Sequence, residues 1–360
     1  MPARVVIAAG GTAGHVVPAL AIADALRGRG AQITFVGGER VEAELVPAAG
    51  YRLERLQVAG LDRRNPLKAA RAAGLAAAAL ARARGLLKRE RADVAIGGGG
   101  YVAGPVGLAA VTRRIPLLLT EADSHLGIAN RMLAPFAGRV CLAFPIGGRD
   151  GDRYLVTGRP VPPGTGTADR AAARERFGIG PEEPCLLVFG GSLGARTLNE
   201  GALEAFGRDA PCAVLHAAGR RDFEDLRRRL AELGDPPHYR LHAYIEPFAE
   251  AYAAADLAAA RAGGSVFELA AAGLPALLVP YPRATADHQA KNARWMEEGG
   301  AAVVIPDSEL SPERLRSVVG ALLADGERLP RMRDAARRLA RPDAAERIAE
   351  EALRLAKEAV

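Results

Sequence analysis

The sequence predicts an α/β protein built from two doubly wound parallel-sheet domains in tandem. Short apolar runs alternate with helical stretches over nearly all of the 360 residues, a pattern typical of βαβ units. The alternation breaks in a Gly- and Pro-rich stretch, residues 145–170, and then restarts. A glycine turn follows the first core strand of each half, "AAGGTAGH" in one and "VFGGSLGAR" in the other. The chain therefore repeats one architecture twice.

The first half is predicted to contain six strands and five helices. The strands are expected at 3–9, 32–36, 53–58, 92–96, 116–120 and 139–143. The helices are expected at 17–29, 40–49, 66–90, 102–113 and 127–135.

The second half repeats the pattern with six strands, six helices and a charged helical tail over 327–359. Its strands are expected at 185–189, 212–216, 239–243, 256–259, 276–279 and 301–304. Its helices are expected at 194–206, 220–233, 247–254, 264–272, 286–298 and 310–323. We predict one domain over 1–157, a second over 158–338, and a C-terminal helix over 339–360 that could return to the first domain.

Composition limits the function classes. The formal charge is +6, which suits an anionic partner such as nucleotide phosphates or an acidic membrane face; nucleic-acid binding has only this charge in its favour and is not predicted. No run of 18 apolar residues and no signal peptide is visible, so a cytoplasmic location is expected. Cys141, Cys185 and Cys212 lie far apart in apolar runs and are expected to be buried thiols without zinc spacing.

The turn "GGTAGH" ends the first strand and opens a helix. Its glycines, Gly10, Gly11 and Gly14, lack the G-x-G-x-x-G spacing, which disfavours a nicotinamide dehydrogenase. A tight turn needs glycine for backbone reasons, but it does not need His15. A histidine at a helix N-terminus has its pKa lowered by the helix dipole, so it stays neutral and can accept a proton.

Three further stretches are candidates for the site. "GGGGYVAGP", 97–105, would let a bulky substrate approach the backbone. "FGGSLGARTLNE", 189–200, offers Ser192 and helix-opening amides to a diphosphate, while its Asn199 could be structural. In 260–293, Arg261 ends a strand, and Glu268 lies in a first helical turn, where it could hold a ribose.

The segment "DGD", 150–152, is interpreted as a solvated turn rather than a metal site.

These motifs, in this order, resemble the MurG family. The residues that carry the resemblance are "GGTAGHVVPALAIADAL", "GGYVAGP", "GGSLGARTLN", "RAGGSVFELAAAGLPALLVPYP" and "DHQAKNA". The resemblance implies a GT-B fold, with the acceptor site in the first Rossmann-like domain and the UDP-sugar site in the second. It implies an inverting transferase without a cofactor that moves N-acetylglucosamine from UDP-N-acetylglucosamine to the muramoyl 4-hydroxyl of lipid I, giving lipid II at the cytoplasmic membrane face.

By this resemblance, residues of the first domain approach the reaction centre and the acceptor. Thr12, Ala13 and Gly14 would line the donor diphosphate side, and His15 would lie close to the reacting atoms. We expect His15 to be the base or its hydrogen-bonding partner, with Glu121 as the rival. The positions on the acceptor side are Tyr101, Glu121 and Asn130. Many members have "HEQN" where this chain has "TEAD", so Asp123 replaces an asparagine, and Pro162 replaces the usual arginine after "GRPV".

The resemblance assigns the donor to the second domain. Ser192 would contact the diphosphate, the backbone of Ile245 would read uracil, and Glu268 would hold the ribose. The remaining donor-side residues are Arg261, Gly264, Ser265, His288 and Gln289. No metal ligand is predicted, because helix-opening amides would neutralise the diphosphate.

Residues 61–91 form a basic amphipathic stretch that would place the protein on the membrane surface; an ordinary packing helix is the alternative. Other functions also remain open. They are a related GT-B transferase with another lipid-linked or small acceptor, a UDP-sugar 2-epimerase, and a non-catalytic UDP-sugar- or lipid-binding protein.

Overall fold

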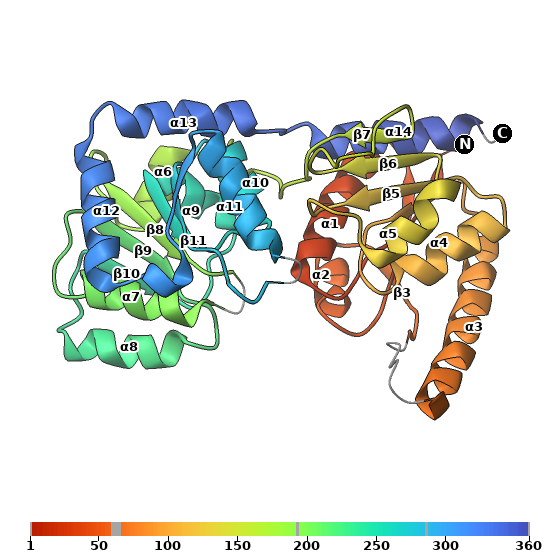
Figure 1. The fold of residues 1–360 in the computed structure, drawn as a ribbon, viewed down its shortest axis with the longest axis horizontal. Helices are drawn as coiled ribbons and strands as arrows, with labels where there is room; N and C mark the ends of the chain where they lie inside the picture. Colours follow the sequence, from red (N-terminus) through yellow and green to blue (C-terminus); the bar gives the residue numbers. More distant parts are fainter. Residues whose placement is uncertain (1, 59–65, 192–193, 285–286, 359–360) are drawn as a thin grey trace. The chain divides into compact units, whose positions relative to one another are not determined.

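The computed structural model describes residues 2–58, 66–191, 194–284 and 287–358, and of residues 66–74 only the helical backbone. The chain forms two compact units (Figure 1). Unit 1 comprises Met1–Pro162 together with Arg341–Val360, and unit 2 comprises Pro163–Ala340. The predicted boundaries, after residues 157 and 338, lie within five residues of these divisions.

Unit 1 contains a seven-stranded sheet and six α-helices in its described part. The strands are β1 (Arg4–Ala8), β2 (Gln32–Gly37), β3 (Arg52–Arg55), β4 (Val94–Gly97), β5 (Leu117–Glu121), β6 (Arg139–Leu142) and β7 (Tyr154–Val156). The helices are α1 (Ala13–Gly28), α2 (Glu42–Ala48), α3 (Pro66–Arg89), α4 (Ala103–Thr112), α5 (Ile128–Leu133) and α14 (Ala344–Glu358), with a 3₁₀ turn η1 (Ala134–Phe136).

The unit 1 sheet is parallel throughout, with strand order β3-β2-β1-β4-β5-β6-β7. The central strand β1 pairs with β2 on one side (Val5 with Ile33) and with β4 on the other (Val5 with Val94). The strand order therefore reverses between β1 and β4. In doubly wound sheets this switch point, at the carboxyl ends of the strands, is where ligands bind.

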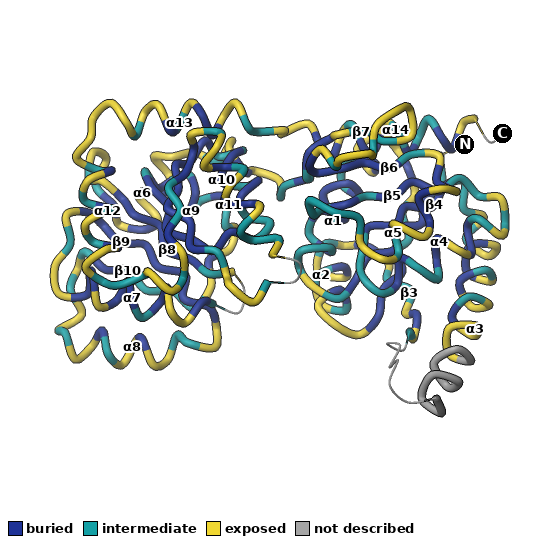
Figure 2. Tube along the Cα trace, in the orientation of Figure 1, coloured by how far each residue is buried: buried dark blue, intermediate teal, exposed yellow. Residues whose placement is uncertain are grey.

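Helices cover both faces of this sheet, and the inner strands β1, β4 and β5 are largely buried (Figure 2). Alternate β1 residues point to opposite cores. Val5 and Ile7 contribute to the core that includes α1, α2 and α14, while Val6 and Ala8 contribute to the core that includes α3, α4 and η1. α14 is held by apolar packing and by an ion pair from Arg139 to Glu351 at 2.8 Å. The C-terminal segment is thus part of unit 1.

Unit 2 contains a six-stranded parallel sheet with order β10-β9-β8-β11-β12-β13. The strands are β8 (Cys185–Phe189), β9 (Ala213–Ala217), β10 (Tyr239–His242), β11 (Leu257–Ala260), β12 (Ala276–Leu278) and β13 (Ala302–Val304). The helices are α6 (Arg170–Arg176), α7 (Arg196–Phe206), α8 (Phe223–Glu232), α9 (Phe248–Ala254), α10 (Ser265–Ala272), α11 (His288–Glu298), α12 (Pro312–Ala324) and α13 (Arg328–Leu339), with a 3₁₀ turn η3 (Asp307–Glu309). Its switch point lies between β8 and β11.

Two elements fall where the sequence predicted only a linker. β7 has three residues and Gly-rich surroundings, so its pattern is too short to read, yet it pairs with β6 through Cys141 and Leu155. α6 begins after Asp169, whose side chain accepts hydrogen bonds from the amides of Ala171 and Ala172. Such an N-cap is a readable signal, and it was missed.

Two smaller predictions, on the "DGD" segment and on the cysteines, are confirmed. The "DGD" segment is an exposed turn before β7. The three cysteines are free and buried, and burial raises the pKa of the Cys141 and Cys185 thiols to about 12. No helix in the described part of the chain combines the length and hydropathy needed to cross a bilayer.

Candidate functional site

The predicted site residues of unit 1 gather at the carboxyl edge of its sheet. The loop after β1 carries Thr12 to His15, the loop after β4 carries Tyr101, and Glu121 ends β5. The first two loops touch through glycine. A Cβ at Gly100 would lie 1.9 Å from the Gly10 carbonyl oxygen, and a Cβ at Gly99 would lie 2.6 Å from Cδ2 of His15. Because no other residue allows this approach, the run "GGGG" brings the β4 loop against His15.

His15 lies in the first turn of α1, with its Nδ1 3.3 Å from the Thr12 hydroxyl. Burial is the main cause that lowers the pKa of His15; the Arg159 charge also lowers it, and the Asp123 charge opposes the change. The predicted direction is therefore right, but the helix dipole is not among the causes. A neutral imidazole whose Nδ1–H is donated to Thr12 keeps a lone pair on Nε2.

Glu121 organises the loop that follows β5. Its carboxylate accepts hydrogen bonds from the amides of Asp123 (3.2 Å) and Gly127 (2.8 Å) and from Nδ2 of Asn130 (3.0 Å). Burial raises the pKa of Glu121 despite these bonds. Both oxygens are already engaged, so the geometry makes Glu121 a weaker candidate for proton transfer than His15.

Three buried polar atoms in this loop and in α5 have no hydrogen-bond partner within the described structure: Ser124 Oγ, His125 Nδ1 and Asn130 Oδ1. Asn130 itself is only 4% exposed, and its Nδ2 is shared between the Thr120 carbonyl and Glu121. Buried polar atoms are normally paired with protein, water or ligand. This loop thus retains hydrogen-bonding capacity beside the predicted acceptor positions.

Glu42, the first residue of α2, is a site residue that the sequence analysis does not single out. Its fully buried carboxylate accepts hydrogen bonds from the Gly11 amide (2.9 Å), the Gly38 amide (2.9 Å) and the Tyr101 hydroxyl (2.7 Å). In the sequence it reads as an ordinary acid in a first helical turn. Gly11 lies 31 residues from Glu42 in the sequence, and Tyr101 lies 59 residues from it, so only the fold reveals these contacts.

Unit 2 gathers its predicted residues at the carboxyl edge of its own sheet. The glycine loop after β8 has left-handed backbone at Gly191 and Gly194, and a Cβ at Gly194 would lie 2.3 Å from the Ala218 carbonyl oxygen. Ser192 lies outside the described residues. Asn199, a buried residue of α7, holds the segment that follows β9. Its Nδ2 donates to the Ala218 carbonyl (2.8 Å) and to Asp222 (3.0 Å).

The Asn199 side chain continues into a buried chain of neutral groups. Its Oδ1 lies 3.0 Å from Nε2 of His216, and His216 Nδ1 lies 2.8 Å from the Tyr239 hydroxyl. Complete burial lowers the pKa of His216 to about 3, so this histidine is neutral at physiological pH. Asn199 is therefore structural, as the sequence allowed.

A cavity of about 750 Å³ opens at this edge, lined by residues from the loops after β8, β9, β11 and β12. Acidic residues in its lining are matched by arginines: Glu200 with Arg196 (3.0 Å), and Asp222 with Arg221 (2.9 Å). The first turn of α7 also reaches the cavity, so its free amides and positive dipole end are available to an anion.

Arg261 lines this cavity but is already engaged. It pairs with Asp307 at 2.5 Å and donates to the Val279 carbonyl at 3.1 Å, which ties β11 to the segment after β12. Gln289 accepts from the Tyr281 amide at 2.9 Å. Asn292, a buried residue of "DHQAKNA" that was not singled out, donates to the Ala262 carbonyl at 3.0 Å and so supports the loop before α10.

Glu268 occupies the first turn of α10, as predicted, and accepts a hydrogen bond of 3.0 Å from the buried Tyr252 hydroxyl. Gly264 precedes the helix, and Ser265 opens it. Ile245 is buried in the loop after β10, and His288 begins α11. All these positions follow carboxyl ends of unit 2 strands.

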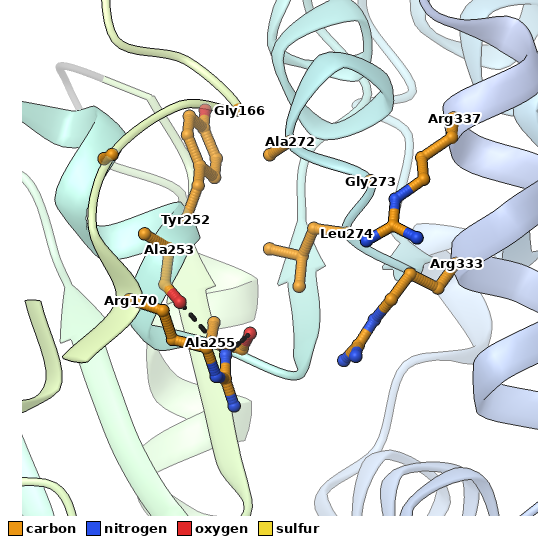
Figure 3. A pocket seen from close by; sticks show the side chains of 11 residues that line it. Gly166, Arg170, Tyr252, Ala253, Ala255, Ala272, Gly273, Leu274, Arg333 and Arg337 are labelled. Carbon is orange, nitrogen blue, oxygen red and sulfur yellow. Dashed lines mark hydrogen bonds between the residues drawn. The ribbon is translucent and has the colours of Figure 1, made fainter. Parts of the chain in front are cut away.

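A second hollow, of about 160 Å³, lies at the opposite, amino-terminal edge of the unit 2 sheet (Figure 3). The arginines that line it bind other groups of the protein. Arg170 donates to the Ala253 and Ala255 carbonyls and, with Arg333, pairs with Asp256. The carbonyl ends of helices disfavour anions, so this hollow is not a second candidate for the nucleotide. No cluster of metal-ligating side chains occurs among the residues that the structure describes.

Comparisons with known proteins agree with this architecture. The model of the glycosyltransferase family 28 N-terminal domain matches residues 5–142, and that of the family's C-terminal domain matches residues 185–348. Two relatives, from Moorella thermoacetica and Salinibacter ruber, are each 42% identical to this chain. They cover 96% and 98% of it and 97% of their own length. Both are named UDP-N-acetylglucosamine--N-acetylmuramyl-(pentapeptide) pyrophosphoryl-undecaprenol N-acetylglucosamine transferase.

Solved structures give the same answer. The crystal structure of Acinetobacter baumannii MurG is 31% identical, with a TM-score of 0.78 over 98% of this chain and 100% of that one. A UDP-N-acetylglucosamine 2-epimerase is only 17% identical at a TM-score of 0.65, a likeness of fold alone. The predicted GT-B fold, with two parallel-sheet units, is thereby confirmed. The chain belongs to the MurG group of glycosyltransferase family 28.

Proposed function

We propose that this protein transfers N-acetylglucosamine from UDP-N-acetylglucosamine to the muramoyl 4-hydroxyl of a pyrophosphoryl-undecaprenol-linked acceptor, lipid I, giving lipid II. The observation that carries the proposal is the near-full-length similarity to relatives named for this transfer, at 42% identity. The two switch points supply what the reaction needs. Unit 1 offers a half-buried histidine whose pKa is lowered, and unit 2 offers a helix N-terminus beside a large cavity.

The donor binds at the unit 2 edge. The diphosphate lies at the N-terminus of α7, where backbone amides and the helix dipole stabilise negative charge, with Ser192 as a further contact. The ribose is held by Glu268, and Ile245 reads uracil through its backbone. His288 and Gln289 meet the sugar hydroxyls. Arg261 acts on the donor indirectly, because its guanidinium already holds Asp307.

His15 is the base. Its Nε2 accepts the proton of the muramoyl 4-hydroxyl as that oxygen forms a bond to the anomeric carbon, and the bond from the anomeric carbon to the diphosphate oxygen breaks with its electron pair leaving on UDP. A positioned base contributes about 10²–10⁴-fold in rate. Amides aimed at the leaving diphosphate contribute about 3 kcal/mol each when they are preorganised. Glu121 shapes the acceptor loop instead, because three donors already occupy its carboxylate.

The acceptor binds at the unit 1 edge, beside Tyr101, Glu121 and Asn130, and the protein lies on the cytoplasmic face of the membrane. Large apolar side chains of this unit are exposed, among them Ile128 (62%), Met132 (69%) and Phe136 (64%) on α5 and η1. Arg63 and Arg64, part of the predicted basic stretch, lie outside the described residues. In the described part of α3, basic residues remain at Arg82, Arg84, Lys88 and Arg89. Exposed apolar side chains on a unit that also carries basic residues suit an anionic bilayer surface.

The test is a transfer assay with purified protein, UDP-N-acetylglucosamine and a short-chain lipid I analogue. Acceptor-dependent release of UDP together with a β-linked disaccharide lipid is expected. UDP release without acceptor together with a free epimerised sugar would show an epimerase and overturn the proposal. Donor binding without turnover on this acceptor would also overturn it, and other acceptors would then be screened.

A further inference from the structure

The Glu42 carboxylate joins three strand-end loops of unit 1 at one point. One oxygen accepts from the Gly11 amide, in the loop after β1, at 2.9 Å. The other accepts from the Gly38 amide, after β2, at 2.9 Å and from the Tyr101 hydroxyl, after β4, at 2.7 Å. Glu42 is 0% exposed. Strands β2, β1 and β4 are neighbours in the sheet, so this one carboxylate spans the switch point.

Glycines leave the space that this carboxylate and the Tyr101 hydroxyl occupy. A Cβ at Gly38 would lie 1.7 Å from the Tyr101 hydroxyl oxygen, and a Cβ at Gly10 would lie 2.8 Å from Glu42 Oε1. A Cβ at Gly37 would lie 2.7 Å from Cγ of Glu42. Gly10 and Gly38 therefore serve more than turn geometry, because they make room for a buried acid and its phenol donor.

The contact fixes two predicted site residues at once. Gly11 immediately precedes Thr12, whose carbonyl accepts the His15 amide at 3.0 Å, so the anchor lies one residue from the turn that holds the base. Tyr101 is held at its hydroxyl by Glu42, and the Arg40 guanidinium lies 5.2 Å from its ring centroid. With the hydroxyl pinned, the ring cannot swing without breaking a hydrogen bond to a charged group, which is among the stronger kinds.

Charge is central to this arrangement. Burial acts to raise the pKa of Glu42, but the hydrogen bonds from Gly11, Tyr101 and Gly38 outweigh it and the pKa is lowered. The group is therefore a carboxylate at neutral pH, with two acceptor oxygens for three donors. An amide of the same shape has only one acceptor oxygen and would turn an N–H₂ group toward a backbone N–H.

We propose that Glu42 is a positioning residue for acceptor recognition: it sets the distance between the His15 turn and Tyr101, and thereby the pose of the muramoyl hydroxyl against the base. Glu42 itself touches neither substrate. The inference rests on the proposed function. It places the larger effect on the acceptor, since the uracil, ribose and sugar contacts proposed for the donor all come from unit 2.

The decisive variant is Glu42→Gln, which keeps the shape and removes the charge. We expect kcat/KM for the lipid I analogue to fall about 10²-fold, the size of effect that a misplacement of about 1 Å produces. The KM for UDP-N-acetylglucosamine should change by only about twofold, because most of the proposed donor contacts come from unit 2 and contribute uniform binding. Glu44→Gln is the matched control, since it makes the same change at an exposed position of the same helix, and it should behave as the unmodified protein.

The outcomes separate the two proposals. If the unmodified protein does not act on lipid I, the proposed function fails. If it acts and Glu42→Gln retains its acceptor kinetics, or loses donor and acceptor KM alike, the positioning role of Glu42 is wrong. Should Glu42→Gln not fold, Tyr101→Phe decides: this change removes one donor to Glu42, and an unchanged acceptor kcat/KM would refute the role.

Discussion

The two units face the same structural problem and solve it with different chemistry. Each must hold a glycine loop in place at the switch point of its sheet. Unit 1 uses ionisable acids, with Glu42 binding the β1, β2 and β4 loops and Glu121 binding the β5 loop. Unit 2 uses a buried amide, Asn199, which donates to the Ala218 carbonyl and to Asp222 after β9 and is backed by the neutral side chains of His216 and Tyr239.

The difference follows from what each edge is proposed to bind. A carboxylate without a counter-ion beside the α7 N-terminus would repel a diphosphate and would neutralise the positive end of the helix dipole that the diphosphate needs. Around the unit 2 cavity, Glu200 and Asp222 are each paired with an arginine. At the unit 1 edge a sugar hydroxyl must lose a proton, and the acid Asp123 raises the pKa of both side chains that could take it. The contrast predicts that changes in unit 1 act on catalysis and changes in unit 2 act on stability and donor binding.

The largest expected effect is in unit 1. His15→Ala should lower kcat by about 10²–10⁴-fold with donor binding retained, because it removes the base. Glu121→Gln should cost less, about tenfold, the equivalent of one weakened charge-assisted hydrogen bond. Steady-state kinetics with the lipid I analogue, alongside calorimetric UDP binding, would compare the two. A larger loss of kcat in Glu121→Gln than in His15→Ala would reverse the assignment of the base.

The sequence predicted this edge only in part, and the reason is physical. Strands and helices follow from local periodicity, so most were placed within a few residues. His15 and Glu121 stand in motifs that can be read along the chain. Glu42 stands in no motif, and its partners Gly11 and Tyr101 come from other loops, so its role depends on which strands become neighbours.

The same limit applies in unit 2. The sequence suggested Arg261 as a donor contact, but the fold brings Asp307 to it across 46 residues. Asn199 and His216 are likewise 17 residues apart and meet only because β8 and β9 are adjacent. Local sequence patterns therefore predict where the loops of the site lie, whereas the residues that hold these loops in place depend on the order of strands in the sheet.

The second prediction concerns the neutral network of unit 2. Asn199→Ala removes the partner of His216 Nε2 and of the Ala218 carbonyl, and leaving buried polar groups unpaired should cost about 2–3 kcal/mol. Trp295, the one tryptophan of the chain, lies in unit 2 against Phe267. Its fluorescence therefore reports the unfolding of unit 2 in denaturant. UDP affinity should fall as well, since the loop after β9, which lines the cavity, loses its hydrogen bonds to α7.

Glu204→Ala is the control for this change. Glu204 lies on the same helix and makes an exposed ion pair with Arg229 at 3.1 Å, and such pairs contribute little. If Asn199→Ala unfolds at the same denaturant concentration as Glu204→Ala, the network does not stabilise unit 2.

The third prediction is the acid sensitivity of unit 2. The pKa of His216 is about 3 in the folded state, below the ordinary value of 6.5. As pH falls, the unfolded chain binds a proton at this histidine before the folded protein does. The contribution of His216 to the free energy of unfolding is therefore complete above pH 6.5 and is lost as pH falls toward 3. Between pH 7 and pH 5 the loss is about 2 kcal/mol.

The Trp295 unfolding transition should show this loss in the unmodified protein and lack it in His216→Gln. The pKa of His242 is also lowered by burial, but that residue is present in both proteins, so their difference isolates His216. Equal loss of stability in both proteins between pH 7 and pH 5 would contradict the linkage.

The smallest effect, and the sharpest test of the base, is a shift in the pH profile. If His15 must be neutral to act, kcat/KM falls as pH drops through its pKa. Arg159 lowers the pKa of His15 and is not among the causes that shift Glu121. Arg159→Gln should therefore move the acid limb to higher pH, whereas Arg159→Lys, which keeps the charge, should leave it in place.

Asp123→Asn should move the acid limb to lower pH whichever group is the base, because Asp123 raises the pKa of both His15 and Glu121. An acid limb that follows Asp123→Asn but ignores Arg159→Gln would make Glu121 the base, and the division between a catalytic histidine and a structural glutamate in unit 1 would have to be reversed.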